Sequence, residues 1–309
     1  MGRVLRLAGI ELGGTKAIAV LAENHRIIEQ CTLPTGIPDK TLEHLNAELR
    51  RWDRHVPLDG LGIASFGPIQ LDLGNPDLGR ILNTPKPGWS GADVRTPLTS
   101  GLTCPCAIDT DVNAAALAEC SVGSAVGCES VCYITIGTGV GGGLVIGGRA
   151  VHGALHPEIG HLRLRRAAGD GFAGICPFHS DCIEGLVSGP ALAQRFGQPA
   201  AQIPDDDPRW DHVAWDLGEL MASIILAVSP ERIVLGGSVA LARANLLDRI
   251  RNHAVLALGD YLRHVDQRTI EEVVVHSRLG PSAGPLGAIT LAESAAKLTS
   301  SDQSEAIDR

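Results

Sequence analysis

Aromatic residues are scarce in this chain, at 3% of its 309 residues. Proteins that bind single-stranded nucleic acid stack bases on aromatic rings, so this shortage argues against such a surface. Positive charge is also scarce. The formal net charge is −9, and no basic run exceeds Arg163–Arg166, which disfavours binding to a phosphate backbone. We therefore expect no nucleic-acid partner.

Long hydrophobic runs are missing too. The longest, near Met221–Val228, is too short to span a bilayer, so no membrane partner is expected. Arg3 and Arg6 are not followed by a signal-peptide cleavage pattern. Without an export signal, the eight cysteines are expected to be reduced thiols rather than disulfides. These features predict an acidic, soluble, cytoplasmic protein that is long enough for two domains.

The chain has no Gly-x4-Gly-Lys-Ser/Thr motif and therefore no P-loop. It does have two Gly/Thr turns between short apolar strands, Gly13–Lys16 and Gly137–Gly141, too far apart for a solenoid repeat. Backbone N–H groups without Cβ atoms can hold an anion, and the Thr hydroxyls add donors. Either turn taken alone is better explained as an ordinary tight hairpin without a ligand, because Gly-Gly turns are common. The pair, with Lys16 in the first, favours phosphate binding by two related α/β lobes that share a cleft.

Cysteine and histidine cluster near the middle of the chain. Cys176, His179 and Cys182 are spaced by three residues, and His161 precedes them. Two thiolates and two imidazoles suit a closed tetrahedral Zn²⁺ site. The four residues include no nucleophile–base pair, so we expect a structural metal. It would fix a loop that carries Glu158 and Glu184.

Asp111 follows a strand-like segment and opens an Ala-rich stretch. It could cap that helix, which is worth about 1 kcal/mol. It could also be a general base, because a carboxylate at a helix N-terminus stays ionised at neutral pH. Spacing alone favours the cap. Leu235–Val239 is a similar strand-turn-helix corner, either ordinary or suited to a nucleotide.

Hydrophobic periodicity predicts the main elements. Helices are expected at 41–54, 113–120, 210–228, from 239 onward and at 286–298, strands at 61–66, 106–109 and 232–235, and a frayed tail at 299–309. The six other cysteines, Cys31, Cys104, Cys106, Cys120, Cys128 and Cys132, stand in apolar or Ala-rich settings and are expected to be core residues.

Together these segments resemble the ROK family of sugar kinases, most closely its bacterial fructokinases, from Gly9 to about Leu291. The resemblance is carried, in chain order, by Gly9–Lys16, Ser65–Pro68, Thr84–Trp89, Thr110–Ala116, Thr135–Gly141, His156–His161, the Cys/His cluster, Ser188–Pro190 and Leu235–Gly237. It implies an α/β, actin-like (ribonuclease-H-like) ATPase fold with two lobes around a central cleft. The small lobe would comprise 1–114 plus 286–309, the large lobe 115–285. A homodimer is expected.

The resemblance also implies a role for each site residue. Asp111 would be the base that activates a sugar hydroxyl. Sugar contacts would come from Gly67, Thr110, Glu158, His161 and Glu184, with His161 also a zinc ligand. ATP would be held by Gly13, Gly14, Thr15, Lys16, Thr138, Gly139 and Pro190, with Gly236 and Gly237 by the adenosine. Glu11 would act on Mg²⁺ through water.

Four departures from glucokinases of this family favour fructose as substrate. Glu11 replaces Asp, Thr110 replaces Asn, His156-Pro157 replaces Ala-Gly, and the cluster has two histidines instead of one. The expected activity is ATP-dependent phosphorylation of D-fructose at its 6-hydroxyl. Phosphorylation of glucose, mannose or an amino sugar is the alternative.

An alternative of another class is a non-catalytic sugar sensor related to ROK repressors. Those repressors carry a helix-turn-helix ahead of the first Gly-Gly-Thr segment, whereas eight residues precede Gly9 here. The acidic net charge also disfavours a repressor.

Overall fold

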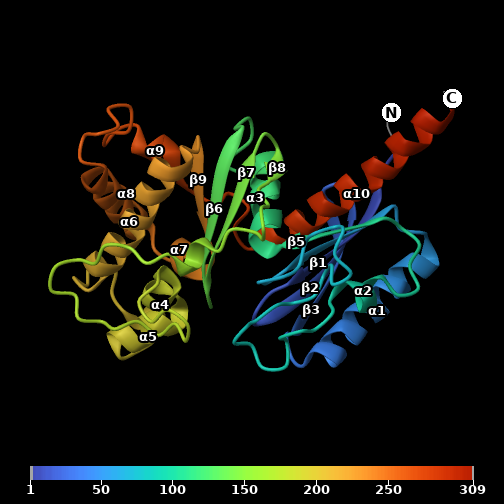
Figure 1. The fold of residues 1–309 in the computed structure, drawn as a ribbon, viewed down its shortest axis with the longest axis horizontal. Helices are drawn as coiled ribbons and strands as arrows, with labels where there is room; N and C mark the ends of the chain where they lie inside the picture. Colours follow the sequence, from blue (N-terminus) through green and yellow to red (C-terminus); the bar gives the residue numbers. More distant parts are fainter. Residues whose placement is uncertain (1–2, 308–309) are drawn as a thin grey trace. The chain divides into compact units, whose positions relative to one another are not determined.

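The computed structural model describes residues 3–307, which form two compact units (Figure 1). The first contains residues up to Ala118, the segment His152–His156, and residues from Ser282 on. The second contains Glu119–Val151 and Pro157–Pro281. The small lobe expected from the sequence comprises residues 1–114 and 286–309, whereas the first unit extends to Ala118 and resumes at Ser282. Residues 152–156 were expected in the large lobe but belong to the first unit.

The first unit is built on a five-stranded sheet in the order β3-β2-β1-β4-β5. Its strands are β1 (Arg6–Leu12), β2 (Lys16–Glu23), β3 (Arg26–Pro34), β4 (Gly60–Ser65) and β5 (Cys106–Thr110). The β1–β2–β3 meander is antiparallel, and β4 and β5 join parallel to β1. Helix α1 (Pro38–His55) packs the side chains expected from its periodicity, Leu42, Leu45, Leu49 and Trp52, into the core on one face.

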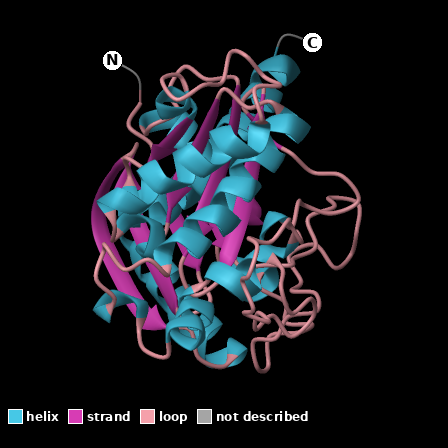
Figure 2. Ribbon diagram, turned by 90° about the vertical axis from the view of Figure 1, so that its left-hand side faces the viewer, coloured by secondary structure: helices cyan, strands magenta, loops and turns pink. Residues whose placement is uncertain are grey.

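The second unit repeats this topology in the order β10-β9-β6-β7-β8. Its strands are β6 (Ser130–Ile136), β7 (Val140–Ile146), β8 (Arg149–Ala150), β9 (Arg232–Gly236) and β10 (Val274–His276). Helices α6 (Trp210–Val228) and α8 (Ala244–Leu258) share a hydrophobic core with the sheet, and lie in front of it in Figure 2. The duplicated hairpin seen in the sequence is thus a duplication of the whole sheet.

The parallel register of each sheet aligns the points where its strands end. In the first unit Leu12 pairs with Ser65, and Ser65 pairs with Thr110. In the second, Thr135 pairs with Gly236. The carboxyl ends of parallel strands lie at one edge of a sheet, which is where open α/β sheets place their ligands. In each unit, the segments that follow the parallel strands therefore lie at the same edge of the sheet.

Helix α10 (Ala283–Ile307) covers the face of the first sheet opposite α1. It approaches the strands closely because glycines face it. A Cβ on Gly60 would lie 2.4 Å from the Ala292 carbonyl oxygen, and one on Gly62 would lie 1.9 Å from that of Ala288. Only residues without side chains allow this backbone-to-backbone contact.

Five residues of the first unit come from the middle of the chain. Within His152–His156, the buried His156 accepts a hydrogen bond at Nε2 from the Ile69 N–H (3.1 Å). His152 contacts the end of β5, as described below. These two histidines anchor the segment to the first unit, and the second unit resumes directly after it at Pro157.

Most predicted elements are confirmed, and two differ. The helix expected from Val239 onward is split into α7 (Ser238–Leu241) and α8. Between them Arg243 takes an extended conformation (φ −137°), and its buried guanidinium stacks 4.2 Å from the Trp210 ring centroid. The tail expected at 299–309 is helical as far as Ile307, where α10 ends, and residues 308–309 lie outside the described residues.

The other helices are short, except for α3. They are α2 (Arg95–Thr99), α3 (Asp111–Val122), η1 (Ile159–His161), α4 (Ile183–Val187), α5 (Gly189–Phe196), η2 (Ala200–Gln202), α9 (Ile270–Val273) and η3 (Gly280–Ser282). Within residues 3–307, none of the helices is both long and apolar enough to cross a membrane.

Substitution of Gly62 by alanine is expected to destabilise the first unit by about 2–3 kcal/mol, since the added methyl group would overlap the α10 backbone. Thermal and urea unfolding of Gly62→Ala measure the effect. Gly171→Ala is the control, because a Cβ there meets nothing within 4 Å and the φ angle is ordinary. Equal stability of the two variants would contradict the tight packing of α10.

Candidate functional site

Hydrogen bonds to the backbone of Gly13 fix the conformation of the first turn, Gly13–Lys16. The Gly13 N–H donates to the Lys16 carbonyl (3.0 Å), and the Thr35 hydroxyl donates to the Gly13 carbonyl (2.7 Å). Gly14, Thr15 and Lys16 are exposed, and a Cβ on Gly14 would meet nothing within 4 Å. The turn is thus fixed in shape and open on its outer side, as an anion-binding turn must be.

Glu11, near the end of β1, carries a buried charge without a donor. Its Oε2 atom is buried and has no hydrogen-bond partner among the described residues. Burial raises the pKa of this carboxyl, although the nearby positive charge of Lys16 opposes the rise. Gly284 leaves room for it, because a Cβ there would lie 2.4 Å from the carboxylate. An orphaned carboxylate oxygen suits a cation or the water bound to one.

Helix α3 is capped by Thr110, not by Asp111. The Asn113 N–H donates to Thr110 Oγ1 (3.1 Å), while Asp111 Oδ1 accepts from the N–H of its neighbour Val112 (2.9 Å). The capping role that spacing favoured for Asp111 is therefore wrong by one residue, because a cap accepts from the third residue after it. Asp111 is the first residue of the helix, next to its positive dipole end.

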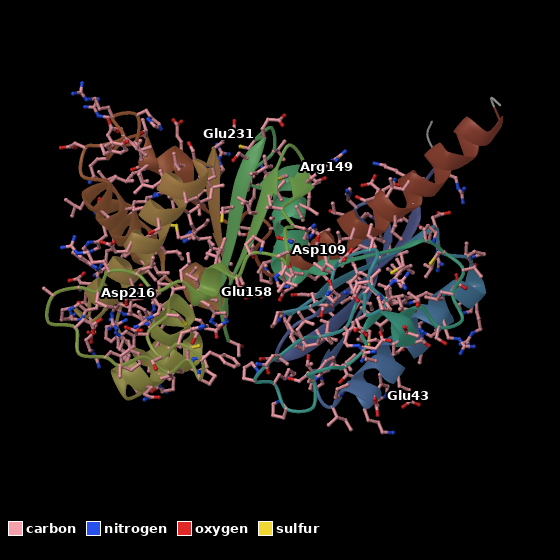
Figure 3. All side chains as sticks on the ribbon, viewed as in Figure 1. Glu43, Asp109, Arg149, Glu158, Asp216 and Glu231 are labelled. Carbon is pink, nitrogen blue, oxygen red and sulfur yellow. The ribbon has the colours of Figure 1, made fainter. Side chains whose placement is uncertain are left out.

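Asp109, Asn113 and His152 form a hydrogen-bonded group beside Thr110 that the sequence did not predict. Buried Asp109 accepts from the Thr110 N–H (2.7 Å) and from Asn113 Nδ2 (2.8 Å) through Oδ1. His152 Nε2 lies 3.0 Å from Asp109 Oδ2, and this bond raises the pKa of the imidazole against the effect of burial. Asp109 lies at the end of β5 (Figure 3). The group fixes the start of α3.

At the edge of the second sheet two other segments meet the Gly137 turn. The Gly137 carbonyl accepts from the Gly189 N–H (2.7 Å), where α5 begins with Ser188 as cap and Pro190 in its first turn. Gly237 has a φ of +85°, and a Cβ on it would lie 2.4 Å from the Ile136 carbonyl oxygen. The predicted ATP residues of this unit, Thr138, Gly139, Pro190, Gly236 and Gly237, thus share one edge.

Glu158 and Glu184 lie near each other in the second unit. Burial and the negative charge of Glu184 raise the pKa of Glu158 to about 7. Glu184 Oε2 accepts from the Val140 N–H (3.1 Å), which ties this carboxylate to the second turn. A carboxyl with a pKa of about 7 can donate or accept a hydrogen bond near neutral pH. Glu158 is labelled in Figure 3.

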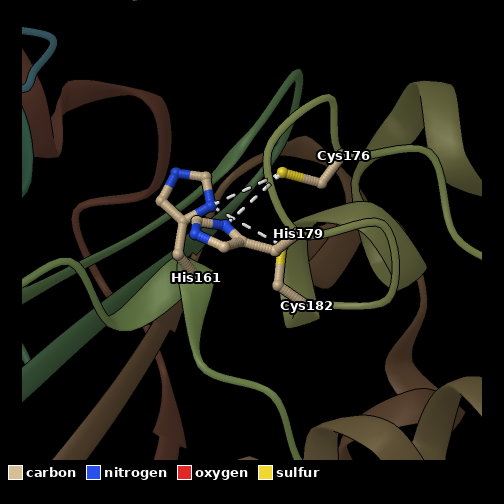
Figure 4. Close-up of side chains that lie close together, drawn as sticks. All are labelled: His161, Cys176, His179 and Cys182. Atoms are coloured by element: carbon tan, nitrogen blue, oxygen red, sulfur yellow. Dashed lines mark hydrogen bonds between the residues drawn. The ribbon is translucent and has the colours of Figure 1, made fainter. Parts of the chain in front are cut away.

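The Cys/His cluster (His161, Cys176, His179, Cys182) converges as its spacing predicted (Figure 4). Cys176 Sγ lies 3.7 Å from His161 Nδ1 and 3.8 Å from His179 Nδ1, and Cys182 Sγ lies 3.6 Å from His161 Nδ1. Tetrahedral bonds of the usual Zn–S and Zn–N lengths place sulfur and nitrogen about 3.6 Å apart. These three distances match that spacing, and all four ligand atoms lie within 4.8 Å of one another, so the cluster could hold a metal ion.

The loop leading to the cluster is fastened by buried ion pairs. Arg195 of α5 donates to Asp170 (2.6 Å) and to Asp216 of α6 (2.8 Å), and all three side chains are at most 6% exposed. Arg166 reaches the same Asp170 (2.6 Å). Asp216 is labelled in Figure 3. These ion pairs thus connect the loop that precedes Cys176 to helices α5 and α6.

The six other cysteines are free thiols, but the expectation that all are core residues is only partly right. Cys132 is buried, whereas Cys31, Cys104, Cys106, Cys120 and Cys128 are half-buried. Burial raises the pKa of Cys106 and of Cys132 to about 12. Such thiols are protonated and poor metal ligands or nucleophiles.

Comparison with known proteins places this geometry in a family. The ROK family matches residues 7–295. A putative fructokinase from Bacillus subtilis is 38% identical over 291 residues, covering 94% of this chain and 96% of the relative. A fructokinase from Zymomonas mobilis is 37% identical, covering 92% and 95% respectively.

The solved structure of a ROK hexokinase from Thermus thermophilus superimposes with a TM-score of 0.72 at 29% identity, covering 94% of this chain and 98% of that one. The two sheets of this chain are thus those of the actin-like ATPase fold. On the match of sequence, sheet topology and turn positions, the chain belongs to the ROK family.

Proposed function

We propose that the protein is a sugar kinase that transfers the γ-phosphoryl group of ATP to the 6-hydroxyl of a hexose, with D-fructose as the substrate. The observation that carries this proposal is the placement of Asp111. It stands at the first residue of α3, at the same sheet edge as the Gly13 turn, while Thr110 makes the capping bond. Its carboxylate is therefore not needed as the cap. The similarity to named fructokinases supports the choice of sugar.

In this proposal Asp111 accepts the proton of the sugar 6-hydroxyl. The hydroxyl oxygen forms a bond to the γ-phosphorus as the bond from that phosphorus to the bridging oxygen of ADP breaks. The dipole of α3 and the Val112 N–H both favour the ionised carboxylate. Phosphoryl transfer asks little more of a protein than positioning and electrostatic stabilisation.

ATP binding is assigned to the two turns and the edge of the second sheet. Gly13, Gly14, Thr15 and Lys16 from the first turn, with Thr138, Gly139 and Pro190, would hold the phosphates, and Gly236 and Gly237 would lie beside the adenosine. The unpartnered Oε2 of Glu11 fits a water bound to Mg²⁺. Mg²⁺ would supply neutralisation of the phosphate charge.

The sugar would be held by Gly67, Thr110, Glu158, His161 and Glu184. Glu158, with a pKa of about 7, can serve a hydroxyl as donor or acceptor. Thr110 is 2% exposed and accepts the Asn113 N–H as a cap, so it offers less to a glucopyranose than a carboxamide would. This supports a ketohexose substrate.

The Cys/His cluster would hold a structural Zn²⁺. The sulfur–nitrogen distances fit the ion, and all four donors are of the kinds zinc prefers. The cluster takes His161 from η1, which follows Glu158, and its Cys182 directly precedes α4, whose first turn contains Glu184. Holding the cluster together would therefore also hold the two acids in place.

Asp111→Asn is expected to lower kcat by about 10²-fold or more, because it removes the base. The Tm is expected to stay near that of the wild type, since Thr110 still caps the helix. A coupled assay of ADP release measures the rate. Asp39→Asn, an exposed acid in the first turn of α1, is the matched control. A wild-type rate in Asp111→Asn would reject the catalytic role.

The cluster is expected to contain close to one zinc ion per chain in protein purified without added metal. Elemental analysis of Cys176→Ser should show that the metal is lost, whereas Cys31→Ser should keep it because Cys31 lies outside the cluster. Loss of zinc should also lower activity in a way that Mg²⁺ does not restore. Zinc content unchanged in Cys176→Ser would exclude this site.

Fructose is expected to give the highest kcat/KM in a panel with glucose, mannose and glucosamine. Thr110→Asn should raise the glucose-to-fructose ratio by roughly tenfold, because Asn also caps helices and adds a donor and an acceptor for sugar hydroxyls. A higher wild-type kcat/KM for glucose than for fructose would overturn the choice of sugar and leave the kinase assignment intact.

A further inference from the structure

Lys86 reaches the first turn from a separate loop. Its ammonium donates to the Gly14 carbonyl (2.5 Å) and to the Thr35 carbonyl (3.2 Å). The loop that carries it is anchored by Trp89, which is fully buried and donates from Nε1 to the Gly36 carbonyl (2.9 Å). The lysine is therefore delivered to the turn by a fixed segment of the fold.

The charge of Lys86 is not balanced by any carboxylate whose side chain the structure describes. Among the side chains of residues 3–298, no carboxylate makes an ion pair with it. Burial lowers the pKa of the ammonium, as expected for a half-buried cation without a counter-charge. Its two acceptors are neutral carbonyls, and an ammonium has three donors. One N–H bond and a full positive charge are left for a ligand.

Lys16 differs from Lys86 in this respect. It belongs to the turn, is exposed, and has the buried carboxylate of Glu11 near enough to interact with its charge. Lys86 is partly shielded from water, and a charge interaction is stronger in such a position than at an exposed one. Of the two lysines, Lys86 gains more from an arriving anion.

We propose that Lys86 is a direct ligand of the transferred phosphoryl group at the first turn. The group is the γ-phosphate of ATP before transfer and the 6-phosphate of the sugar product after it. The proposal rests on the proposed function, because it takes the first turn as a phosphate site. It adds a cation from a loop outside the turn, which the sequence motif of the turn does not contain.

A purely structural role for Lys86 makes a different prediction. If its ammonium only joins its loop to the turn, its loss lowers stability and weakens all nucleotides alike. A phosphoryl ligand instead discriminates between nucleotides with and without a γ-phosphate. The informative measurement is therefore the Kd of an ATP analogue compared with the Kd of ADP.

The test uses full-length, zinc-containing protein and the variants Lys86→Met and Lys86→Arg. Calorimetry compares the Kd of a non-hydrolysable ATP analogue with that of ADP, both with Mg²⁺. We expect Lys86→Met to bind the analogue at least tenfold more weakly and ADP within about twofold of wild type. Lys86→Arg should restore much of the loss. Lys40→Met, an exposed lysine in α1, is the charge-matched control.

A second arm separates the two sources of the phosphate. Inhibition by the sugar 6-phosphate is measured in the same variants. Weakening of the analogue alone assigns Lys86 to the nucleotide state, and weakening of the sugar phosphate alone assigns it to the product state. Equal weakening of analogue and ADP, or unchanged affinity for both phosphate ligands, overturns the proposal.

Failure of the proposed function would look different. It would appear as a wild-type protein that phosphorylates no hexose in the panel. The binding arm needs no turnover, so it still tests Lys86 in that event. An active wild type whose Lys86→Met variant has normal analogue and sugar-phosphate affinity would reject Lys86 alone.

Discussion

The parallel pairing of strands is the constraint from which both candidate sites follow. Because β1, β4 and β5 run side by side in register, the Gly13 turn, Phe66 and Asp111 must leave the sheet at one edge. The same pairing of β6 with β9 brings the Gly137 turn to Gly237. No side chain has to draw these segments together. Side-chain bonds, such as that of Thr35 to Gly13, only fix their shape.

Both sheet edges that carry candidate site residues contain charged side chains that are partly buried and lack a full set of opposite charges or hydrogen bonds. Among the described residues, a buried oxygen of Glu11 has no hydrogen-bond donor and Lys86 has no carboxylate partner, and Glu158 lies near the like charge of Glu184. Each arrangement lowers the stability of the free protein. Natural proteins tolerate such conflicts at functional sites, where a ligand removes them. Elsewhere in the second unit, buried charges such as Arg195 and Asp216 are paired.

The features that could be predicted from the sequence are local ones. The Cys/His cluster lies within one stretch of the chain, residues 161–182, and α6 follows helical periodicity; both were predicted from the sequence. The contacts of His152 with Asp109, and of Lys86 with Gly14, join residues far apart in the chain. No periodic pattern encodes such pairs. The cap was misplaced by one residue because Thr110 and Asp111 are both good capping residues.

The packing of α10 on the glycines of β4 has a consequence for synthesis on the ribosome. The strands of the first sheet are complete once Thr110 has been made, but α10, which covers one face of that sheet, is made only after residue 282. The second unit ends at Pro281, before α10 begins. Since domains fold as units, we expect the second unit to fold first. The first unit, although its strands are translated earliest, would then be completed last. Until α10 is made, one face of its sheet stays uncovered and open to chaperones.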